Sequence, residues 1–428
     1  MAADRRPDLE AWEMALRDAV HLAGAKCLEA FLSRLAAARP TASVRCACGH
    51  VMRSRGRKAT TILTILGPVR FRRALHQCPA CGQTRYPADE VLDVAGTSRS
   101  PGLRRMMARA GSQTTFKEGA ADLRLYAGLP ISPKDVERVA ERLGAETEAW
   151  AARERLALLA AEPPAAGTKS IPVLYIEPDG TGVPMVPPEL AGRRGKQPDG
   201  SARTREAKLG SVFTQFVNDE EGRPIRDPES TTFVGAIESA EDFAVRLFAE
   251  AVRRGLPQAR RVVVLSDGAE WIKNLVAEYF PQALHIIDLF HAKEHVGELT
   301  KLLFPTDPNQ RQRCRLDWWT ALDEGRIKDL AREATALLPD NPTAREDAES
   351  HIHYLEKNKD RMRYAEFRAL GLFVGSGVVE AGCKTMIGQR LKRSGMEWSV
   401  RGANAIIALR CTLNSGRFEE FWEDRAVS

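Results

Sequence analysis

The sequence predicts a multidomain α+β protein in which helical segments flank a mixed α/β core. Two observations lead to this prediction. Paired cysteines bracket a short stretch with strand character near the N-terminus, and apolar strand-like runs alternate with amphipathic helices between residues 171 and 291. The 428 residues, 43% of them hydrophobic and 28% charged, provide for about two to four domains with cores of their own.

The composition excludes an unfolded chain and a membrane-spanning one. Hydrophobicity and charge are ordinary for globular proteins. No apolar run approaches the ~20 residues that cross a bilayer, and the charged start MAADRRPDLEAWE lacks the apolar core of a secretion signal. We therefore expect a cytoplasmic protein with no membrane partner.

The net charge of +6 is small, but the basic residues are clustered. Eight Lys or Arg residues and no acid lie between residues 46 and 88, and further basic blocks lie at 192–208 and 384–410. Three such blocks predict a surface that contacts a polyanion such as nucleic acid, whereas any one block alone is equally well a solvated face. The candidate contacts in the last two blocks are Arg193, Arg194, Lys196, Arg203, Lys384, Arg390, Lys392 and Arg393, with Trp398 as a candidate for stacking on a base.

The N-terminal segment, residues 1–43, is expected to be helical. Apolar residues recur at helical spacing from residue 8 to residue 38, and the pattern ends before Pro40. We expect this amphipathic helix to be broken near Gly24.

A zinc ribbon is predicted at residues 44–92. Two close cysteine pairs surround two strand-like runs, and paired cysteines in a cytosolic chain are typical of a tetrahedral zinc site. The expected ligands are Cys46, Cys48, Cys78 and Cys81. The first pair has one intervening residue in place of the usual two, so His50 is a possible substitute ligand, and unligated core cysteines are the alternative. The remaining cysteines, Cys27, Cys314, Cys383 and Cys411, are expected to be small buried side chains.

Residues 98–160 are predicted to be helical and to contain a helix-turn-helix. One helix is expected to end at Gly128, and Ser132 is expected to cap the next, with Pro133 at its first position. Two helices joined by a tight turn that contains Gly are typical of DNA-binding proteins whose second helix enters the major groove. An ordinary helical hairpin is the alternative.

A Pro- and Ala-rich linker at 161–170 precedes the α/β core at residues 171–291. The predicted order of its elements is βββαβαβ, with carboxylates at the ends of strands, which is typical of a mixed sheet of the ribonuclease-H type. Residues 292–374 are expected to form a helical insertion, and residues 375–428 the last helices of the core.

Three carboxylates are the candidate catalytic residues. Asp179 and Asp267 each follow an apolar strand and precede a glycine, and Glu380 lies near the start of a helix rich in Lys and Arg. Carboxylates at adjacent strand ends repel one another unless cations lie between them, and their hard oxygen atoms favour Mg²⁺ or Mn²⁺. Two such ions ~3.5–4 Å apart support phosphodiester chemistry. Glu177, on the same face of the strand as Asp179, is an alternative metal ligand.

A competing motif lies at residues 291–295. His291, Glu294 and His295 fit H-x-x-E-H, the pattern of inverted zinc peptidases, in which both histidines bind one zinc ion. The alternative is that Asp288 and His291 border the carboxylate site while the other two residues face a helix surface. No G-x-S-x-G elbow and no G-x-x-x-x-G-K-[ST] loop occurs in the sequence, which leaves serine hydrolases and P-loop ATPases without support.

Several long motifs occur in order along the chain, among them YIEPDGTGVPMV, VVVLSDGAEWIKN, IIDLFHAKEH and GSGVVEAGCKTMIGQRLKRSGMEWS. Together with the N-terminal cysteine region, they resemble the transposases of bacterial insertion sequences of the ISKra type. The resemblance implies a DDE transposase with a ribonuclease-H-like catalytic domain, in which Asp179, Asp267 and Glu380 bind the metal ions. IIDLFH resembles the Asp-x-x-His block of Mutator-like enzymes, which implies Asp288 and His291 as second-rank site residues.

The same resemblance implies a reaction and its partners. The expected reaction is Mg²⁺-dependent cleavage at the ends of an insertion sequence, followed by transfer of the freed 3′-hydroxyl into target DNA, close to the nucleoid of a bacterial cell. Double-stranded DNA is the implied partner, and the need to pair two ends implies a homodimer or a larger synaptic complex. The alternatives are a non-catalytic DNA-binding regulator on the same fold, and the zinc peptidase.

Overall fold

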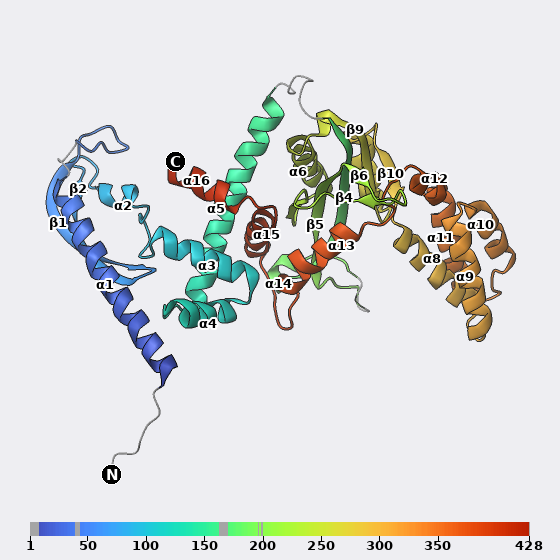
Figure 1. Ribbon diagram of the computed structural model, residues 1–428, viewed down its shortest axis with the longest axis horizontal. Helices are drawn as coiled ribbons and strands as arrows, with labels where there is room; N and C mark the ends of the chain where they lie inside the picture. Colours follow the sequence, from blue (N-terminus) through green and yellow to red (C-terminus); the bar gives the residue numbers. More distant parts are fainter. Residues whose placement is uncertain (1–7, 39–42, 162–169, 196, 198–199, 428) are drawn as a thin grey trace, which may run out of the picture. The chain divides into compact units, whose positions relative to one another are not determined.

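The computed structural model describes residues 8–38, 43–161, 170–195, 197 and 200–427, and it contains two compact units. Unit 1 consists of residues 1–143 with 422–428, and unit 2 consists of residues 144–421. The division falls inside the long helix α5 (Pro133–Ala160), and most of the predicted linker at 161–170 lies outside the described residues. Figure 1 labels the elements of both units.

Unit 1 begins with a helix packed on a three-stranded antiparallel sheet. The elements are α1 (Leu9–Ala38), β1 (Arg53–Thr64), β2 (Gly67–Gln77) and β3 (Thr84–Arg85), in the strand order β1-β2-β3. Their shared core contains Ala25, Leu32, Ile62, Val69 and Phe71. The predicted break near Gly24 is wrong, because α1 is one continuous helix. The missing side chain of Gly24 instead makes room for Leu66, which lies 3.2 Å from where a Cβ atom would be.

Further helices complete unit 1. They are α2 (Pro87–Val91), α3 (Pro101–Gln113), α4 (Phe116–Ala127), the first part of α5 and the end of α16 (Phe418–Val427). Both helix ends predicted at the turn are confirmed. α4 ends at Gly128, whose φ of 66° suits glycine, and the Ser132 hydroxyl accepts a hydrogen bond from Asp135 N at 3.1 Å at the start of α5.

Unit 2 contains the predicted mixed sheet. Its strands are β4 (Ile171–Pro184), β5 (Thr204–Gln215), β8 (Thr232–Ala236), β9 (Ala259–Ser266) and β10 (Leu284–Ile287), in the order β10-β9-β4-β5-β8. β4, β9 and β10 are parallel, whereas β5 is antiparallel to both β4 and β8. A two-stranded sheet of β6 (Val217–Asn218) and β7 (Pro224–Ile225) follows β5.

Both faces of this sheet are covered, which explains the continuous apolar runs of its strands. Leu174 and Ile176 of β4 are buried against α6 (Ala240–Arg253) and α7 (Glu270–Tyr279). The alternate residues Val173 and Tyr175 belong to the core on the opposite face, which continues into the helical insertion.

The helical insertion predicted after β10 is helical in the structure. It contains α8 (Leu289–Leu303), α9 (Pro308–Asp323), α10 (Ile327–Ala336), α11 (Pro342–Asn358) and α12 (Tyr364–Ala369), and Figure 1 shows these helices beyond the β10 edge of the sheet. The chain then returns to the sheet through α13 (Gly377–Gly382), a π-helical segment (Cys383–Gly388), α14 (Gln389–Leu391) and α15 (Val400–Asn414).

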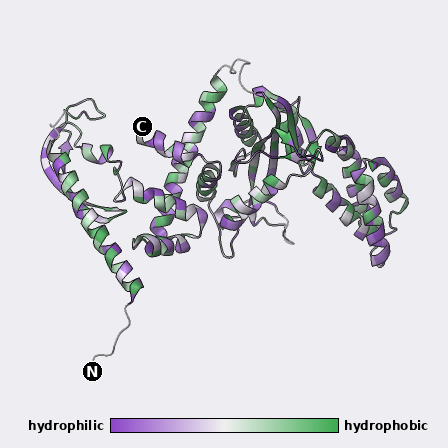
Figure 2. Cartoon of the chain, viewed as in Figure 1, coloured by the Kyte–Doolittle hydropathy of each residue, from purple (hydrophilic) through white to green (hydrophobic). Residues whose placement is uncertain are grey.

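Figure 2 shows hydrophilic and hydrophobic residues interspersed along the helices. Among the described residues, none of the helices combines the length and the apolar character that crossing a membrane requires.

Candidate functional site

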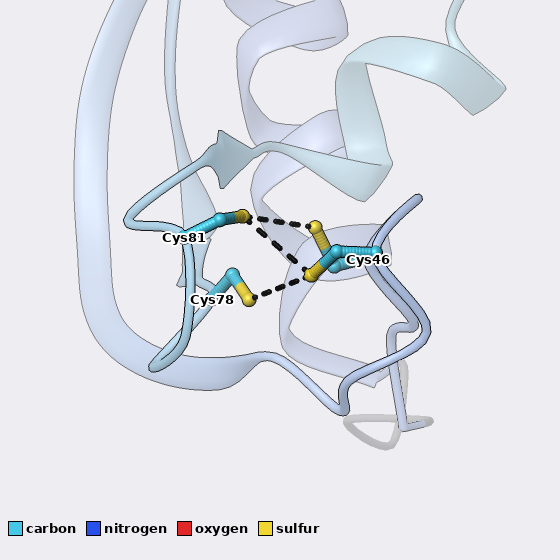
Figure 3. A group of neighbouring side chains, drawn as sticks. Cys46, Cys78 and Cys81 are labelled. Atoms are coloured by element: carbon cyan, nitrogen blue, oxygen red, sulfur yellow. Dashed lines mark hydrogen bonds between the residues drawn. The ribbon is translucent and has the colours of Figure 1, made fainter.

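The predicted cysteine ligands converge in unit 1. Their sulfur atoms are separated by 3.5 Å between Cys46 and Cys81, 3.5 Å between Cys48 and Cys78, and 3.6 Å between Cys48 and Cys81 (Figure 3). These spacings are close to the about 3.8 Å expected between thiolates at ~2.3 Å from a tetrahedral zinc ion. The cluster could therefore hold zinc with four sulfur ligands.

Two tight backbone turns present these thiols. Gly49 N donates to Cys46 O at 2.9 Å, and Gly82 N donates to Cys78 O at 3.1 Å, so each pair projects from one turn. The backbone N–H of Cys81 helps to lower the pKa of Cys78 to about 6, whereas hydrogen bonds with the neighbouring thiols raise the pKa of Cys48 and of Cys81. Without a cation, the cluster therefore favours one thiolate and not four, and metal binding would release the other protons. His50 Nδ1 lies 3.6 Å from the sulfur of Cys48, but four sulfur atoms complete the set without it.

The predicted catalytic carboxylates share a second site, in unit 2. Asp179, Asp267 and Glu380 line one cleft of about 920 Å³, together with His291 and Lys384. The strand register explains why the two aspartates meet. Ile176 of β4 pairs with Val264 of the parallel strand β9, and three residues further on come Asp179 and Asp267. Asp267 directly follows β9 as predicted, whereas Asp179 lies inside β4, because pairing with β5 extends that strand to Pro184. Glu380 comes to the same place from α13. We name this site the carboxylate cleft.

The electrostatics of the carboxylate cleft disfavour a bare negative charge. Burial raises the pKa of Asp179, and the neighbouring Asp267 adds to this effect. A hydrogen bond from the Cys383 thiol and one from Gly180 N, at 2.7 Å from Asp179 Oδ1, partly oppose the shift. Cys383 is buried as predicted, but its contact with Asp179 had no signal in the sequence.

His291 contacts two carboxylates at the edge of the cleft. Its Nε2 lies 3.9 Å from Glu380 Oε1, and its Nδ1 lies 3.3 Å from Glu294 Oε2. With Asp288, His291 and Glu380 form a group whose spacing could hold a metal ion.

Two further carboxyl groups lie beneath the cleft and hold α13. Asp288 is fully buried; its Oδ1 accepts from His291 N at 2.8 Å, and its Oδ2 accepts from the Ser376 hydroxyl at 2.8 Å and from Ser376 N. Glu177 is also fully buried, and its Oε2 accepts from Val379 N at 2.8 Å. Burial raises the pKa of Glu177 to about 8. Glu177 therefore does not line the cleft, although the sequence had left it open as a metal ligand.

The predicted DNA contacts separate into exposed and buried residues. Lys384 and Lys392 line the carboxylate cleft, and Lys392 hydrogen-bonds to the hydroxyl of Thr181. The exposed residues outside the cleft are Arg193, Arg194, Arg203 and Arg393. Lys196 lies outside the described residues.

The prediction that Arg390 and Trp398 contact DNA is wrong, because both side chains are buried and neither offers a surface to DNA. Trp398 Nε1 donates to Leu391 O at 3.0 Å, and the Arg390 guanidinium lies 5.0 Å from the centre of the Trp398 ring. The physical reason is the π-helical segment Cys383–Gly388, which changes the helical phase and turns Arg390 inward.

The competing zinc-peptidase motif does not form a metal site. His291 faces the carboxylate cleft, whereas His295 Nδ1 lies 2.9 Å from His351 Nδ1, and the His295 ring stacks on Tyr354 at 3.6 Å. The two histidines therefore have different partners. Tyr354, which the sequence did not single out, donates from its hydroxyl to the Asp267 carbonyl at 2.7 Å and fixes the chain at that aspartate.

The scattered cysteines follow their prediction in part. Cys383 and Cys411 are buried, whereas Cys314 is half-buried and Cys27 is exposed on α1. Cys27 thus corrects the expectation of a buried side chain, because it lies on the face of α1 opposite the hairpin core.

Comparisons with known proteins give distant similarities. A family model described as "Uncharacterised protein family (UPF0236)" matches residues 226–424, which include Asp267 and Glu380 but not Asp179. The "UPF0236 protein in vanSb 3'region" of Streptococcus gallolyticus is 22% identical over 376 residues, which is 84% of this chain and 74% of that protein. The Drosophila P element transposase strand transfer complex is 12% identical, over 75% of this chain and 80% of that chain, with a TM-score of 0.24. A TM-score of this size does not define a shared fold.

Proposed function

We propose that this chain is a DDE transposase of the kind its motifs resemble, with a ribonuclease-H-like catalytic domain that cleaves and joins DNA. The observation that carries the proposal is the convergence of Asp179, Asp267 and Glu380 in one cleft beside two lysines. The sheet supports the proposal as well. Its strands β4, β5 and β8 pair in antiparallel fashion, and β9 and β10 extend the sheet from β4 as parallel strands.

The three carboxylates would hold two Mg²⁺ or Mn²⁺ ions, which when bound activate the attacking oxygen and stabilise the leaving oxygen of a phosphodiester. The donor set fits such ions for two reasons. All three side chains offer hard carboxylate oxygens, and the raised pKa of Asp179 is a condition that a nearby cation relieves.

The other residues of the cleft would place the substrate and the ligands. Lys384 and Lys392 would hold the DNA phosphates along one wall. His291 would orient the carboxylate of Glu380, to which its Nε2 is near. Asp288 and Glu177 would fix the first turn of α13, so that the Glu380 side chain is already held near the two aspartates.

Unit 1 would supply recognition of the DNA ends. The four cysteines would hold a structural zinc ion, and the start of α5 would enter the major groove as the second helix of the helix-turn-helix. Arg70 and Arg72 lie on the exposed face of β2, opposite the side that packs on α1, and would contact phosphates. A reaction on two ends requires more than one copy of the chain.

The proposal is tested with labelled DNA that carries the sequences flanking the gene, in Mg²⁺, in Mn²⁺ and in EDTA. The wild-type protein is expected to cleave and join this DNA only with a divalent ion. Asp179→Asn is expected to keep DNA binding and to lose cleavage, because it removes one ligand charge. Asp329→Asn, a half-buried carboxylate on α10, is the matched control and is expected to behave as wild type.

Other outcomes would point elsewhere. End-specific binding without cleavage in either metal would replace the transposase with a DNA-binding regulator. Cleavage that persists in Asp179→Asn would refute the carboxylate mechanism.

A further inference from the structure

Helix α1 of unit 1 has an apolar face on each side. One side packs on the β1–β2 hairpin through Ala25 and Leu32. The other carries large apolar side chains that are exposed, with Leu16 and Val20 each at 67%. Isolated exposed apolar residues are common on proteins, but a continuous stripe of them indicates a partner.

The exposed stripe has a regular spacing. Its members are Leu9, Trp12, Leu16, Val20, Ala23, Cys27 and Phe31, all of them exposed. Successive members are three, four and four residues apart, and this pattern then repeats. An 11-residue repeat advances 3.67 residues per turn, close to the 3.6 of a straight helix, so the stripe stays on one face for about 33 Å. Such a face suits another helix laid along it.

The side-chain sizes of the stripe are complementary to those of a second copy that runs in the opposite direction. When two copies are aligned antiparallel with Val20 opposite Val20, the large Trp12 lies opposite the small Cys27, and Leu16 lies opposite Ala23. Leu9 and Phe31 then meet at both ends. A parallel alignment instead stacks Trp12 on Trp12 and leaves gaps at Ala23.

The charges of α1 favour the same orientation. Its first half, up to Val20, carries Glu10, Glu13 and Asp18 against one arginine, whereas its second half carries Lys26 and Arg34 against one glutamate. Antiparallel pairing brings the acidic half of one helix to the basic half of the other, and it also opposes the two helix dipoles.

We propose that the exposed stripe of α1 binds the same stripe of a second copy of this chain, as an antiparallel helix pair with its twofold axis at Val20. The interface is isologous, so it closes as a dimer and does not propagate. It does not depend on the activity of the carboxylate cleft, and its test is independent of cleavage.

The first test is the mass of the full chain in solution, by light scattering and sedimentation. The wild type is expected to be a dimer of 47.3 kDa chains. Val20→Glu places two carboxylates at the axis and is expected to raise the dissociation constant by roughly 100-fold or more. Leu22→Glu is the matched control, because Leu22 is 63% exposed on the same helix but lies off the stripe. A monomeric wild type, a dimeric Val20→Glu, or equal dissociation of both variants would overturn the proposal.

The second test fixes the orientation by disulfide trapping under mild oxidation. In the antiparallel pair the two Cys27 residues are about 21 Å apart along the helices, far beyond disulfide reach, so the wild type is expected to remain uncrosslinked through Cys27. Val20→Cys in a Cys27→Ser background is expected to crosslink, because the two copies of residue 20 face each other. Crosslinking through Cys27 itself would contradict the antiparallel arrangement.

Discussion

At the scale of single residues, Glu177 shows how a buried carboxyl group can serve a reaction without touching the substrate. Its Oε2 accepts the Val379 N–H, one residue before Glu380, and so holds the first turn of α13 against β4. A lost hydrogen bond to a buried backbone group costs about 1–3 kcal/mol. Glu177 is therefore expected to act as a positioning residue.

Two substitutions separate this role from that of a metal ligand. Glu177→Gln keeps a carbonyl oxygen for Val379 N, and we expect cleavage within a few-fold of wild type and an unchanged Mg²⁺ requirement. Glu177→Ala removes the acceptor, so α13 loosens, and we expect at least a tenfold loss of cleavage and a higher half-saturating Mg²⁺ concentration. Metal titrations of cleavage measure both effects. If Gln abolished activity as fully as Asp179→Asn, Glu177 would be a ligand after all.

The protonation of His285 is expected to make the stability of unit 2 depend on pH. Arg361 Nη1 lies 3.4 Å from His285 Nδ1, and a guanidinium can only donate, so Nδ1 accepts and the Nε2–H faces the Ser266 hydroxyl at 2.8 Å. Burial, with a contribution from Arg361, lowers the pKa of His285 from 6.5 to about 3. The folded chain thus holds this ring neutral under conditions in which the unfolded chain protonates it.

The direction of this pH dependence follows from the difference in proton binding between the unfolded and the folded state. Below pH 6.5 His285 binds a proton in the unfolded state but not in the folded state. Acidification toward pH 3 therefore lowers the contribution of His285 to the free energy of unfolding by about 1.4 kcal/mol per pH unit. His285→Gln is expected to be less stable at pH 7.5 but to lose less stability on acidification. Urea unfolding at pH 7.5, 6 and 5, followed by tryptophan fluorescence, measures both slopes. Parallel slopes for the two proteins would refute the assignment.

At the scale of elements, the cysteine cluster of unit 1 is supported by only a small apolar core. The apolar group around it contains Cys46, Met52 and Cys78 with Val44, whereas the far end of the hairpin shares a larger core with α1. Small cores of this size depend on a metal for their stability. Zinc removal is therefore expected to act locally.

Hydrogen exchange checks this expectation. After treatment with a zinc chelator, amides at 44–52 and 77–85 are expected to exchange at least tenfold faster, while those around Ile62 and Val69 stay protected. Cys46→Ser is expected to reproduce the effect without chelator, and Cys314→Ser, which changes a half-buried thiol on α9 of unit 2, is expected to leave exchange in these segments unchanged. Exchange that rises evenly through the hairpin would show that zinc supports the whole unit.

The elements also show which features a sequence can predict. Asp267 directly after its strand, the turn at Gly128 and the cysteine pairs are local patterns, and each lies where it was expected. Asp179 was expected after a strand but lies inside β4, because pairing with β5 extends that strand to Pro184. The inward turn of Arg390 depends on a π-helical segment, and the continuity of α1 at Gly24 depends on the nearby Leu66 side chain. Both are tertiary effects that periodicity along the chain does not contain. The roles of Cys383 and Tyr354 beside the aspartates likewise depend on contacts between distant segments.

At the scale of the whole molecule, the distribution of charge sets how DNA binding should respond to salt. Arg70 and Arg72 pair with Thr61 and Ala59 on the outer face of the hairpin, and the alternate residue Phe71 points into the core. Arginines that neutralise phosphates release counterions, and each contributes about 0.9 to the slope of log affinity against log salt on duplex DNA. The two arginines therefore provide a quantitative test of where unit 1 meets DNA.

The double variant Arg70→Gln with Arg72→Gln is expected to lower that slope by about 2 and to weaken binding on all duplexes alike, because phosphates carry no sequence information. Arg332→Gln, an exposed arginine on α10, is the matched control and should leave the slope unchanged. Binding is measured by fluorescence anisotropy from 50 to 300 mM salt. The Asp179→Asn protein should keep the wild-type slope, because the substitution removes no lysine or arginine that neutralises a phosphate. If instead Asp179→Asn lowered the slope and the arginine variant did not, DNA would be held chiefly by the carboxylate cleft, and the assignment of end recognition to the hairpin would fail.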